Sequence, residues 1–442
     1  MTFGRIGRTL ALIPILALAA PSSAQAQTME EVLNGLFVFS SGGDPLFLAG
    51  STTNGHGNHF IPSEQQSNGS LLAIFNDAIA ANVSNFPLSS TVSSQTFKFV
   101  GGVPTATSNS FGPIFAERAQ TLGRGRFDVG MNYSSISFDH IRGTPLDAVS
   151  LNFVHENSDG PGCSEFFGDD CSKYGVPGFE HDVIQLDMDL QIRAKIYAFM
   201  ATLGVTDWMD IGFAVPVVEM SIDGTSQARI IPSNINDIAH RFGGTATDPQ
   251  LNASSVTRGT TTGVGDVAAR IKARVLDSDE TSAAFLATVR LPTGRKEDFL
   301  GSGETSVHGM FIGSATLGDF SPHVNLGYVG RLGETDVNGF TYAAGFDQKL
   351  SDWATFAVDI LGEFKLGDSL MFPGAVTFDP PITRTVDRVN IANIRDDIVD
   401  GSLGFKFRTD GGLILWTNAL LSLNNGGMRS GIVGSFGIQF GT

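Results

Sequence analysis

Residues 184–196 read IQLDMDLQIRAKI, and in this stretch apolar and polar side chains alternate without a break. The apolar set runs from Ile184 to Ile196, and every residue between its members is polar or charged. Because successive side chains on a β-strand point to opposite sides, the stretch predicts a strand with one apolar and one polar face. The alternation extends over residues 181–201, whereas strands of soluble sandwiches average about 5–6 residues. The length favours a tilted membrane strand over a soluble β-sandwich, which is the main alternative.

The same period of two continues from about residue 95 to the end of the chain. It predicts about fourteen strands, an even number as expected for single-chain bacterial membrane barrels. The predicted strands are 95–101, 125–139, 145–156, 181–201, 203–222, 263–276, 281–292, 304–317, 321–332, 338–350, 353–365, 398–408, 412–424 and 431–441.

Short and long connections alternate along these strands. The short turns are rich in Gly, Asp and Ser, and the longer segments are 157–180, 223–262, 292–304, 333–338, 366–397 and 424–430. Membrane barrels show this asymmetry, with short periplasmic turns on one rim and longer extracellular loops on the other. We therefore predict an all-β fold, a transmembrane antiparallel β-barrel over residues 95–442, with both chain ends on the short-turn side.

The N-terminal residues 1–26 have the features of a secretory signal peptide. Two arginines precede an apolar run at residues 10–20, and the small residues Ala24 and Ala26 fit cleavage after Ala26. The chain is therefore expected to be exported and to reside in the bacterial outer membrane.

Residues 27–94 differ from the rest because they are rich in Ser, Asn and Gly. A helical period appears only at residues 70–83, which predicts one short amphipathic helix. We expect a partly helical segment that plugs or caps the barrel.

The composition excludes one class of partner. The 442-residue chain has a formal net charge of −17, whereas nucleic-acid binding needs a basic surface. The expected partners are outer-membrane lipid and small solutes, with no nucleic acid.

The two cysteines, Cys163 and Cys171, lie in the stretch GCSEFFGDDC. In an exported protein this close pair predicts a local disulfide. Metal binding is the alternative, but it needs further ligands and His181 is the only nearby candidate. We expect no metal or cofactor.

The polar faces of the predicted strands are expected to line the lumen. The charged candidates for this lining are Asp187, Asp189, Arg193, Lys195, Arg270, Lys272, Arg274, Asp359 and Glu363. The basic set on strand 263–276 either attracts an anionic solute or pairs with these carboxylates. Asp187 and Asp189 share one face and offer a second reading, acid–base hydrolysis. The apolar row of 184–196 would then meet lipid, so a charge at Leu190 is expected to disrupt assembly.

Several spaced segments resemble one known family. They are PLSS (87–90), SFGPIFAERAQTLGRGR (110–126), GVGDVAARIKAR (263–274), LPTGRKEDFLGSG (291–303) and FSPHVNLGY (320–328). In this order they resemble the bacterial outer-membrane family named for the meta-pathway of phenol degradation, which is similar to the outer-membrane transporters of fatty acids and aromatic hydrocarbons. The resemblance covers residues 87–441 and implies a barrel that passes hydrophobic or aromatic molecules inward. The chain departs from the usual aromatic end of such barrels, because Gly441 and Thr442 follow Phe440.

The predicted function is passive uptake of hydrophobic or aromatic small molecules, and no enzymatic activity is expected. The loops 157–180, 223–262 and 366–397 would capture the solute. Aromatic residues on these loops either form an apolar entrance or pack within the loops: Phe166, Phe167, Phe242 and Phe372. The alternatives are a closed structural or adhesive barrel with binding loops, and a barrel-embedded hydrolase.

Overall fold

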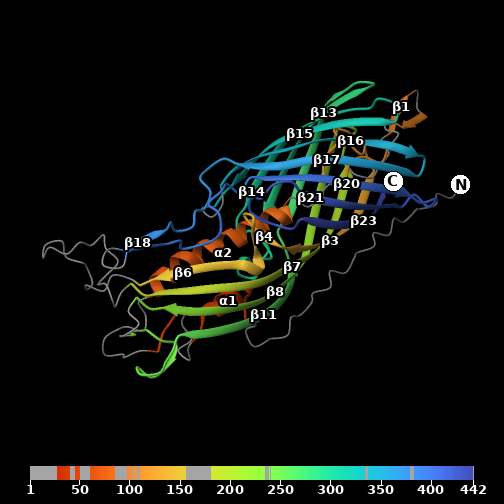
Figure 1. Ribbon diagram of the computed structural model, residues 1–442. Coiled ribbons are helices and arrows are strands. Elements are labelled where there is room, and N and C mark those ends of the chain that lie inside the picture. The colour runs from red at the N-terminus through yellow and green to blue at the C-terminus, as the bar shows by residue number, and fades with distance from the viewer. Residues whose placement is uncertain are drawn as a thin grey trace.

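The fold is seen in a computed structural model (Figure 1) that describes residues 27–39, 45–49, 60–84, 97–100, 103–106, 110–155, 181–233, 238, 240–333, 337–378 and 383–441. The predicted signal peptide, the predicted Cys163–Cys171 disulfide, Phe166 and Phe167 lie outside the described residues and stay predictions.

Twelve antiparallel strands form a closed barrel. Closure comes from pairing of the last strand with the first, where Phe436 lies opposite Tyr133. In order around the barrel the strands are β3 (Phe127–Phe138), β7 (Val183–Gly204), β8 (Met209–Ile231), β12 (Val267–Asp277), β13 (Thr281–Leu291), β14 (Ser306–Ala315), β15 (Phe320–Arg331), β16 (Gly339–Ser351), β17 (Ala354–Lys365), β20 (Ile398–Arg408), β21 (Ile414–Ser422) and β23 (Ile432–Gly441).

Two further strands, β6 (Val149–Val154) and β11 (Asn252–Val264), join the sheet beyond the barrel. Strands β7 and β8 are long enough to continue past the barrel wall, and their far halves pair with β6 and β11. We call this four-stranded part the extension. Figure 1 shows it at the end opposite the C terminus.

The predicted count of about fourteen barrel strands is wrong by two. The predicted strand 145–156 contains β6, but β6 runs along the same edge of β7 as β3 does and only continues that row. The predicted strand 95–101 contains β1 (Phe97–Val100), which pairs only with β2 (Val103–Ala106). Strand β11 lies in the predicted loop 223–262, because its Ser, Thr and Gly residues carry no apolar period.

Helices fill the inner side of the extension. They are α1 (Met29–Asn34), the 3₁₀ helix η1 (Gly35–Phe37) and α2 (Ile61–Ser84). Thr28 caps α1 with a capping box, in which its hydroxyl accepts from Glu31 N and the Glu31 carboxylate accepts from Thr28 N. No helix of the described residues is long and apolar enough to cross a membrane.

Short elements complete the long-loop end. Three strands form a small sheet in the order β22, β4, β5, and two hairpins stand apart. These elements are β4 (His140–Ile141), β5 (Thr144–Pro145), η2 (Leu146–Ala148), β9 (Gly243–Gly244), β10 (Pro249–Gln250), η4 (Lys296–Asp298), β18 (Val376–Phe378), β19 (Arg384–Val386) and β22 (Met428–Arg429).

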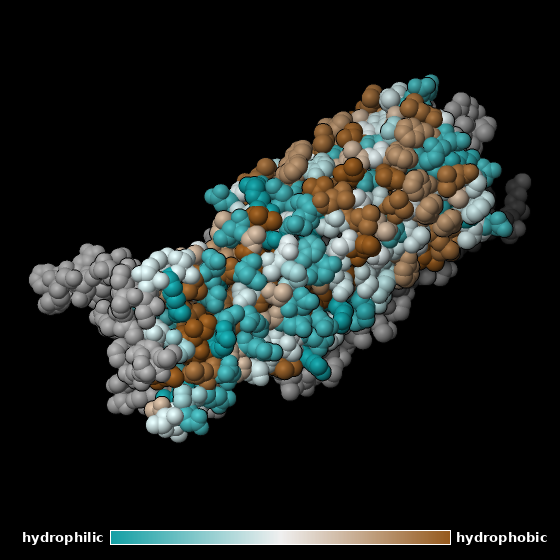
Figure 2. All heavy atoms as spheres, viewed as in Figure 1, coloured by the Kyte–Doolittle hydropathy of each residue, from teal (hydrophilic) through white to brown (hydrophobic). Residues whose placement is uncertain are grey.

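The outer face of the barrel carries an apolar belt. Figure 2 shows hydrophobic residues gathered over the barrel strands and hydrophilic residues over the middle of the molecule. Exposed members of the belt include Phe127, Val129, Phe199, Leu203, Phe213, Val215, Ile271, Phe285, Val289, Phe311, Leu326, Tyr328, Ile360, Phe364, Leu403, Phe436, Ile438 and Phe440. A closed antiparallel barrel with such a belt has the construction of a transmembrane barrel.

The edge of the belt is marked on β7 and β8. Lys195 and Glu219 lie opposite each other on the outer face, with Lys195 Nζ 2.8 Å from Glu219 Oε1. One step toward the barrel, the ring of Tyr197 lies 5.0 Å from that of Tyr133, which is itself 5.0 Å from Phe436. An ion pair followed by an aromatic group is the sequence expected at a membrane–water interface.

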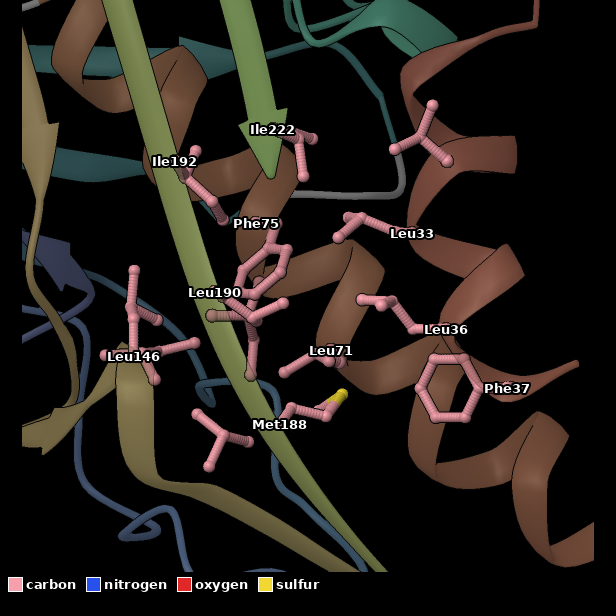
Figure 3. Close-up of a cluster of buried hydrophobic side chains, with 14 of the residues drawn as sticks. Leu33, Leu36, Phe37, Leu71, Phe75, Leu146, Met188, Leu190, Ile192 and Ile222 are labelled. Atoms are coloured by element: carbon pink, nitrogen blue, oxygen red, sulfur yellow. The ribbon is translucent and has the colours of Figure 1, made fainter. Parts of the chain in front are cut away.

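The predicted orientation of residues 184–196 is reversed in the structure. The apolar row is buried on the inner side, and Leu190 is 2% exposed. In Figure 3 the side chains of Met188, Leu190 and Ile192 lie among those of Leu33 and Phe75 from the two helices. This part of β7 belongs to the extension, where water surrounds the outer face, so the apolar face turns inward to the helices.

Candidate functional site

A segment of the chain lies inside the barrel at its short-turn half. Residues 110–122, which we call the strap, precede β3, and most of their side chains are buried. The strap has no partner strand, so barrel side chains satisfy its backbone. Glu117 N donates to Asn325 Oδ1 at 2.7 Å, and Leu122 N donates to the Asp210 carboxylate at 3.1 Å. Polar wall residues therefore fix a segment that has no regular structure.

Charged pairs join the strap to the wall. Glu117 pairs with Arg270 and lies 3.7 Å from Lys272 Nζ. Arg118 pairs with Asp347, and its Nε lies 3.1 Å from Asp347 Oδ1. All five side chains are buried, so each charge needs its partner to offset the loss of hydration.

Lys406 helps to hold the first part of the strap, together with Thr355, whose Oγ1 accepts from Phe111 N at 3.0 Å. Lys406 Nζ donates to the carbonyl oxygens of Phe111 at 3.1 Å and Pro113 at 2.5 Å. Ile114 packs over Gly404, where any side chain would collide with its Cδ1 atom. The strap and these wall residues fill the short-turn half of the lumen.

A cavity of ≈ 180 Å³ lies between the strap and the long-loop end of the lumen. Phe115 and Glu117 of the strap form its floor together with Arg270. Together with polar ones, apolar side chains on the inner face of the wall line part of the rest: Leu286, Met310, Val329, Ala343 and Leu361. The cavity is therefore a chamber of mixed polar and apolar lining, closed below by the strap.

Charged side chains gather where the cavity meets the long-loop rim. Arg331 Nη2 donates to Glu363 Oε1 at 2.7 Å, and Lys365 Nζ lies 3.8 Å from the same oxygen. Asp400 pairs with Arg429, and Arg290 completes the group. Deeper in the wall, His308 Nε2 lies 2.8 Å from Thr341 Oγ1. The cavity thus has a charged rim above walls of mixed polar and apolar side chains.

Four of the predicted lining residues lie inside the barrel. Arg270 and Lys272 contact the strap, Glu363 is at the rim, and Asp359 lies 2.6 Å from His323 Nε2. Arg274 lies at the short-turn end, where it is 3.3 Å from Asp277 Oδ2. The basic residues of β12 were expected either to attract an anionic solute or to pair with carboxylates. Arg270 and Lys272 pair with a carboxylate, that of Glu117 on the strap.

The placement of the other four lining candidates corrects the prediction. Asp187, Asp189 and Arg193 are exposed and Lys195 is partly exposed, all on the outer face of β7. Their strand half lies in the extension, beyond the apolar belt, so their polar face meets water instead of the lumen. The carboxylate pair therefore does not form a hydrolytic site in the lumen.

The two described aromatic residues of the predicted entrance are buried within the long-loop end. Phe242 packs edge-to-face on Phe39 with ring centroids 5.4 Å apart, and Phe372 lies under the guanidinium of Arg142 at 5.6 Å. Both pack within the protein and do not present an exposed apolar entrance.

Sequence reasoning missed the residues that matter most in the lumen. Arg290 and Arg331 escaped attention because each is a lone charge at the end of an apolar strand. Glu117 and Arg118 lie in the segment 110–126 that carried the family resemblance, but that segment has no period from which a position inside the barrel follows. The alternation of side chains along the strand could have predicted that Arg290 faces the lumen, because the adjacent residue Val289 faces outward.

Comparison with known proteins adds fold-level likenesses only. No family model matches the chain. No curated protein matches it either. Among solved structures, a COG4313 outer membrane channel from Pseudomonas putida F1 has a TM-score of 0.42 and 9% identity, covering 74% of this chain and 99% of that one. A FadL homologue from Pseudomonas aeruginosa has a TM-score of 0.31 and 14% identity, covering 72% and 89%. The TodX deltaS2S3 mutant monoaromatic hydrocarbon channel has a TM-score of 0.32 and 8% identity, covering 74% and 92%. At TM-scores below 0.5 these likenesses carry no inference about function.

Proposed function

We propose that the protein is a bacterial outer-membrane barrel for passive uptake of small hydrophobic or aromatic molecules. The observation that supports this most is the partly apolar cavity, which is closed on one side by the strap and not by the barrel wall. Among the described residues, a molecule held above Phe115 is separated from the short-turn end by residues 110–122 and the wall side chains that contact them. Movement of that segment opens a path without breaking the barrel.

The strap is attached in a way that permits such movement. It joins β3 through Gly123 and Gly125, whose φ angles are +91° and +78°. Residues other than glycine rarely adopt these backbone angles, so this connection is a turn that depends on glycine. The strap's contacts to the wall are side-chain hydrogen bonds and ion pairs, which can exchange for water without unzipping a sheet.

The rest of the chain is assigned to match this function. Residues 1–26 direct export, residues 27–94 form a cap, and residues 95–442 form the barrel with the strap inside. Support for the cap comes from α1 and η1, whose buried residues pack against β8 and β11. The protein acts without a cofactor and is not an enzyme.

A closed structural or adhesive barrel is the second candidate. The buried pairs Glu117–Arg270 and Arg118–Asp347 favour it, because they fix the strap firmly. Breaking such a pair costs about 3–5 kcal/mol when one partner is removed. A barrel that never opens would need no such cavity, whereas a channel uses one to hold its solute.

A reversible tether on the strap separates the two candidates. Ala119 N donates to Ser314 Oγ at 3.2 Å, so the pair Ala119→Cys and Ser314→Cys brings two thiols together. The measurement is the initial uptake of radiolabelled 2-phenylethanol by cells whose outer membrane carries the protein. We expect uptake above vector cells for the wild type, background uptake for the oxidised double variant, and recovery on reduction.

Each single cysteine variant and the wild type, with and without reductant, are the controls. Since the wild type contains Cys163 and Cys171, its own response to reductant sets the baseline. Equal uptake by oxidised and reduced double variant contradicts passage past the strap. Wild-type uptake equal to that of vector cells supports the closed barrel.

A further inference from the structure

The rim of the cavity contains one row of side chains that the proposed function leaves unexplained. Strand register places Arg290 of β13 opposite Ser306 of β14, and Ser306 opposite Arg331 of β15. All three face the cavity. Neighbouring strands lie about 4.8 Å apart, so two guanidinium-bearing positions flank a small hydroxyl across about 10 Å. The row forms a notch with donors on both sides and on its base.

The charge balance around this notch is positive. Three carboxylates line the cavity, and each contacts at least one cation. Glu363 contacts both Arg331 and Lys365, and Glu117 contacts both Arg270 and Lys272. Arg290 adds a further cation to the same wall. The lining itself contains three arginines and three carboxylates. Lys272, Lys365 and Arg429 contact those carboxylates from outside the lining, so in the combined group six cations face three carboxylates.

On β13 and β14 the wall changes from polar to apolar with depth below the notch. The next inward row contains Thr288 and His308, and the row after that contains Leu286 and Met310. Rows that face the same side are about 6.6 Å apart along a strand. A ligand with its polar end in the notch would thus place its other end among apolar side chains, above Phe115 on the floor.

We propose that the cavity is a binding site for a small amphiphilic carboxylate, with one aromatic ring or a short alkyl chain. The carboxylate lies in the notch against Arg290 and Ser306, since a planar guanidinium binds a carboxylate through paired hydrogen bonds. The ring or chain lies between Leu286 and Met310. An apolar cavity of about 150 Å³ accepts one benzene ring, and this cavity measures ≈ 180 Å³. This inference rests on the proposed function and names its solute class.

Calorimetric titration of the purified protein in detergent tests the site. The probes are phenylacetate and 2-phenylethanol, which share ring and chain and differ in charge. We expect the wild type to bind phenylacetate at least tenfold more tightly than 2-phenylethanol. Arg290→Gln should remove that preference by weakening phenylacetate binding far more than 2-phenylethanol binding, and Arg290→Lys should retain part of the preference.

Two further variants separate charge from shape. Ala343→Phe fills the cavity and should weaken both probes alike. Arg193→Gln is the matched control, because Arg193 is exposed on the outer face of β7, and it should change neither. If Arg290→Gln does not fold, the salt dependence of the wild type serves instead. Raising salt from about 50 to about 500 mM screens charge and should weaken phenylacetate binding alone.

Equal affinity of the wild type for both probes overturns the carboxylate site, and so does an unchanged phenylacetate affinity in Arg290→Gln. The outcome for transport is read separately in the strap-tether experiment. Uptake of 2-phenylethanol that depends on the strap, without a preference for phenylacetate, leaves the channel standing and refutes the site. Phenylacetate binding that depends on Arg290, without strap-dependent uptake, supports the site and refutes the channel.

Discussion

Three arginine substitutions along β7 test the reversal of its faces. Asp189→Arg changes an exposed residue on the outer face of the extension. Leu190→Arg changes its buried neighbour, and Ala201→Arg changes an exposed position in the apolar belt, opposite Val129 on β3. The three positions represent water, protein interior and lipid on one strand, so their order of cost reports the environment of each.

The structure sets a different cost at each position. At Asp189 the side chain meets water, and such surface changes stay within about ±0.5 kcal/mol. At Ala201 an arginine meets lipid, which costs about 2–4 kcal/mol near the bilayer midplane. At Leu190 there is no free volume, because a side-chain carbon on neighbouring Gly224 would lie 3.2 Å from Leu190 Cδ2 and 2.9 Å from Leu36 Cδ1. An unpaired charge there costs about 3–5 kcal/mol.

Urea unfolding of protein folded into lipid vesicles, followed by tryptophan fluorescence, measures these differences. Limited proteolysis shows where each defect lies. Leu190→Arg should release the cap helices to protease while the barrel stays resistant to SDS without heating. Ala201→Arg should instead lower the yield of assembled barrel. A Leu190→Arg variant as stable as Asp189→Arg, with a protected cap, would refute the inward assignment of this row.

Three other perturbations give measurable outcomes. The double variant Glu117→Gln with Arg118→Gln removes both charges by which the strap pairs with the wall, so single-channel openings in planar bilayers should become more frequent. The control is Arg258→Gln, which breaks an exposed pair with Asp223 and should leave the openings unchanged. Unaltered openings in the double variant would argue against strap gating. Burial raises the pKa of Glu64 in α2 from its ordinary 4.5 to about 6, against the opposing hydrogen bond from Asn68. The folded protein then holds a proton that the unfolded chain releases, so this group's contribution is fully present below pH 4.5 and is lost as the pH rises through about 6, by at most about 2 kcal/mol. Thermal unfolding at both ends of this range should show a smaller pH dependence in Glu64→Gln, and an identical dependence would contradict the burial of a protonated carboxyl. Gly204→Ala should reduce barrel assembly, because the added side chain would collide with the carbonyl oxygen of Gly123. The control Gly309→Ala has open space around it and should assemble normally. Equal yields of the two variants on a heat-modifiability gel would count against the tight approach at Gly204.

The alternation of apolar and polar residues was enough to predict most of the barrel. Twelve predicted strands correspond to barrel strands, and the outward residues of β12 and β13 are those predicted from parity, such as Ile271 and Phe285. The predicted number of barrel strands was wrong because two separate strands, β3 and β6, pair with the same edge of the long strand β7. A period of two gives the two faces of each piece, but it does not say that β3 and β6 lie end to end.

Alternation also does not say which face is inside. In a membrane the apolar face points outward, and in water it points inward, so the same pattern has two solutions. The sequence of β7 beyond residues 184–196 indicates where the environment of the strand changes. From Tyr197 onward the outer positions are apolar as well, while inner positions such as Ala198 and Met200 remain so. A strand that is apolar on both faces over a few residues is passing from one environment to the other.

The lumen was the least predictable part. The charges of the wall could be assigned to the interior on β12, but their partners on the strap lie about 150 residues away in sequence and follow no period. Arg290, Ser306 and Arg331 become neighbours only once two hairpin registers are fixed. Site geometry of this kind depends on pairing that a single sequence does not specify.

The position of the strap bears on assembly of the barrel. It precedes the first barrel strand, yet it contacts walls on the far side of the ring, and the ring closes only when the last strand, β23, meets β3. Before closure Arg118 can reach Asp347 directly across the open sheet, whereas after closure it reaches Asp347 only through an end of the barrel. Pairing of β23 with β3 is the step that closes the ring around the strap. Variants that slow this last pairing should accumulate open barrels with a solvent-accessible strap.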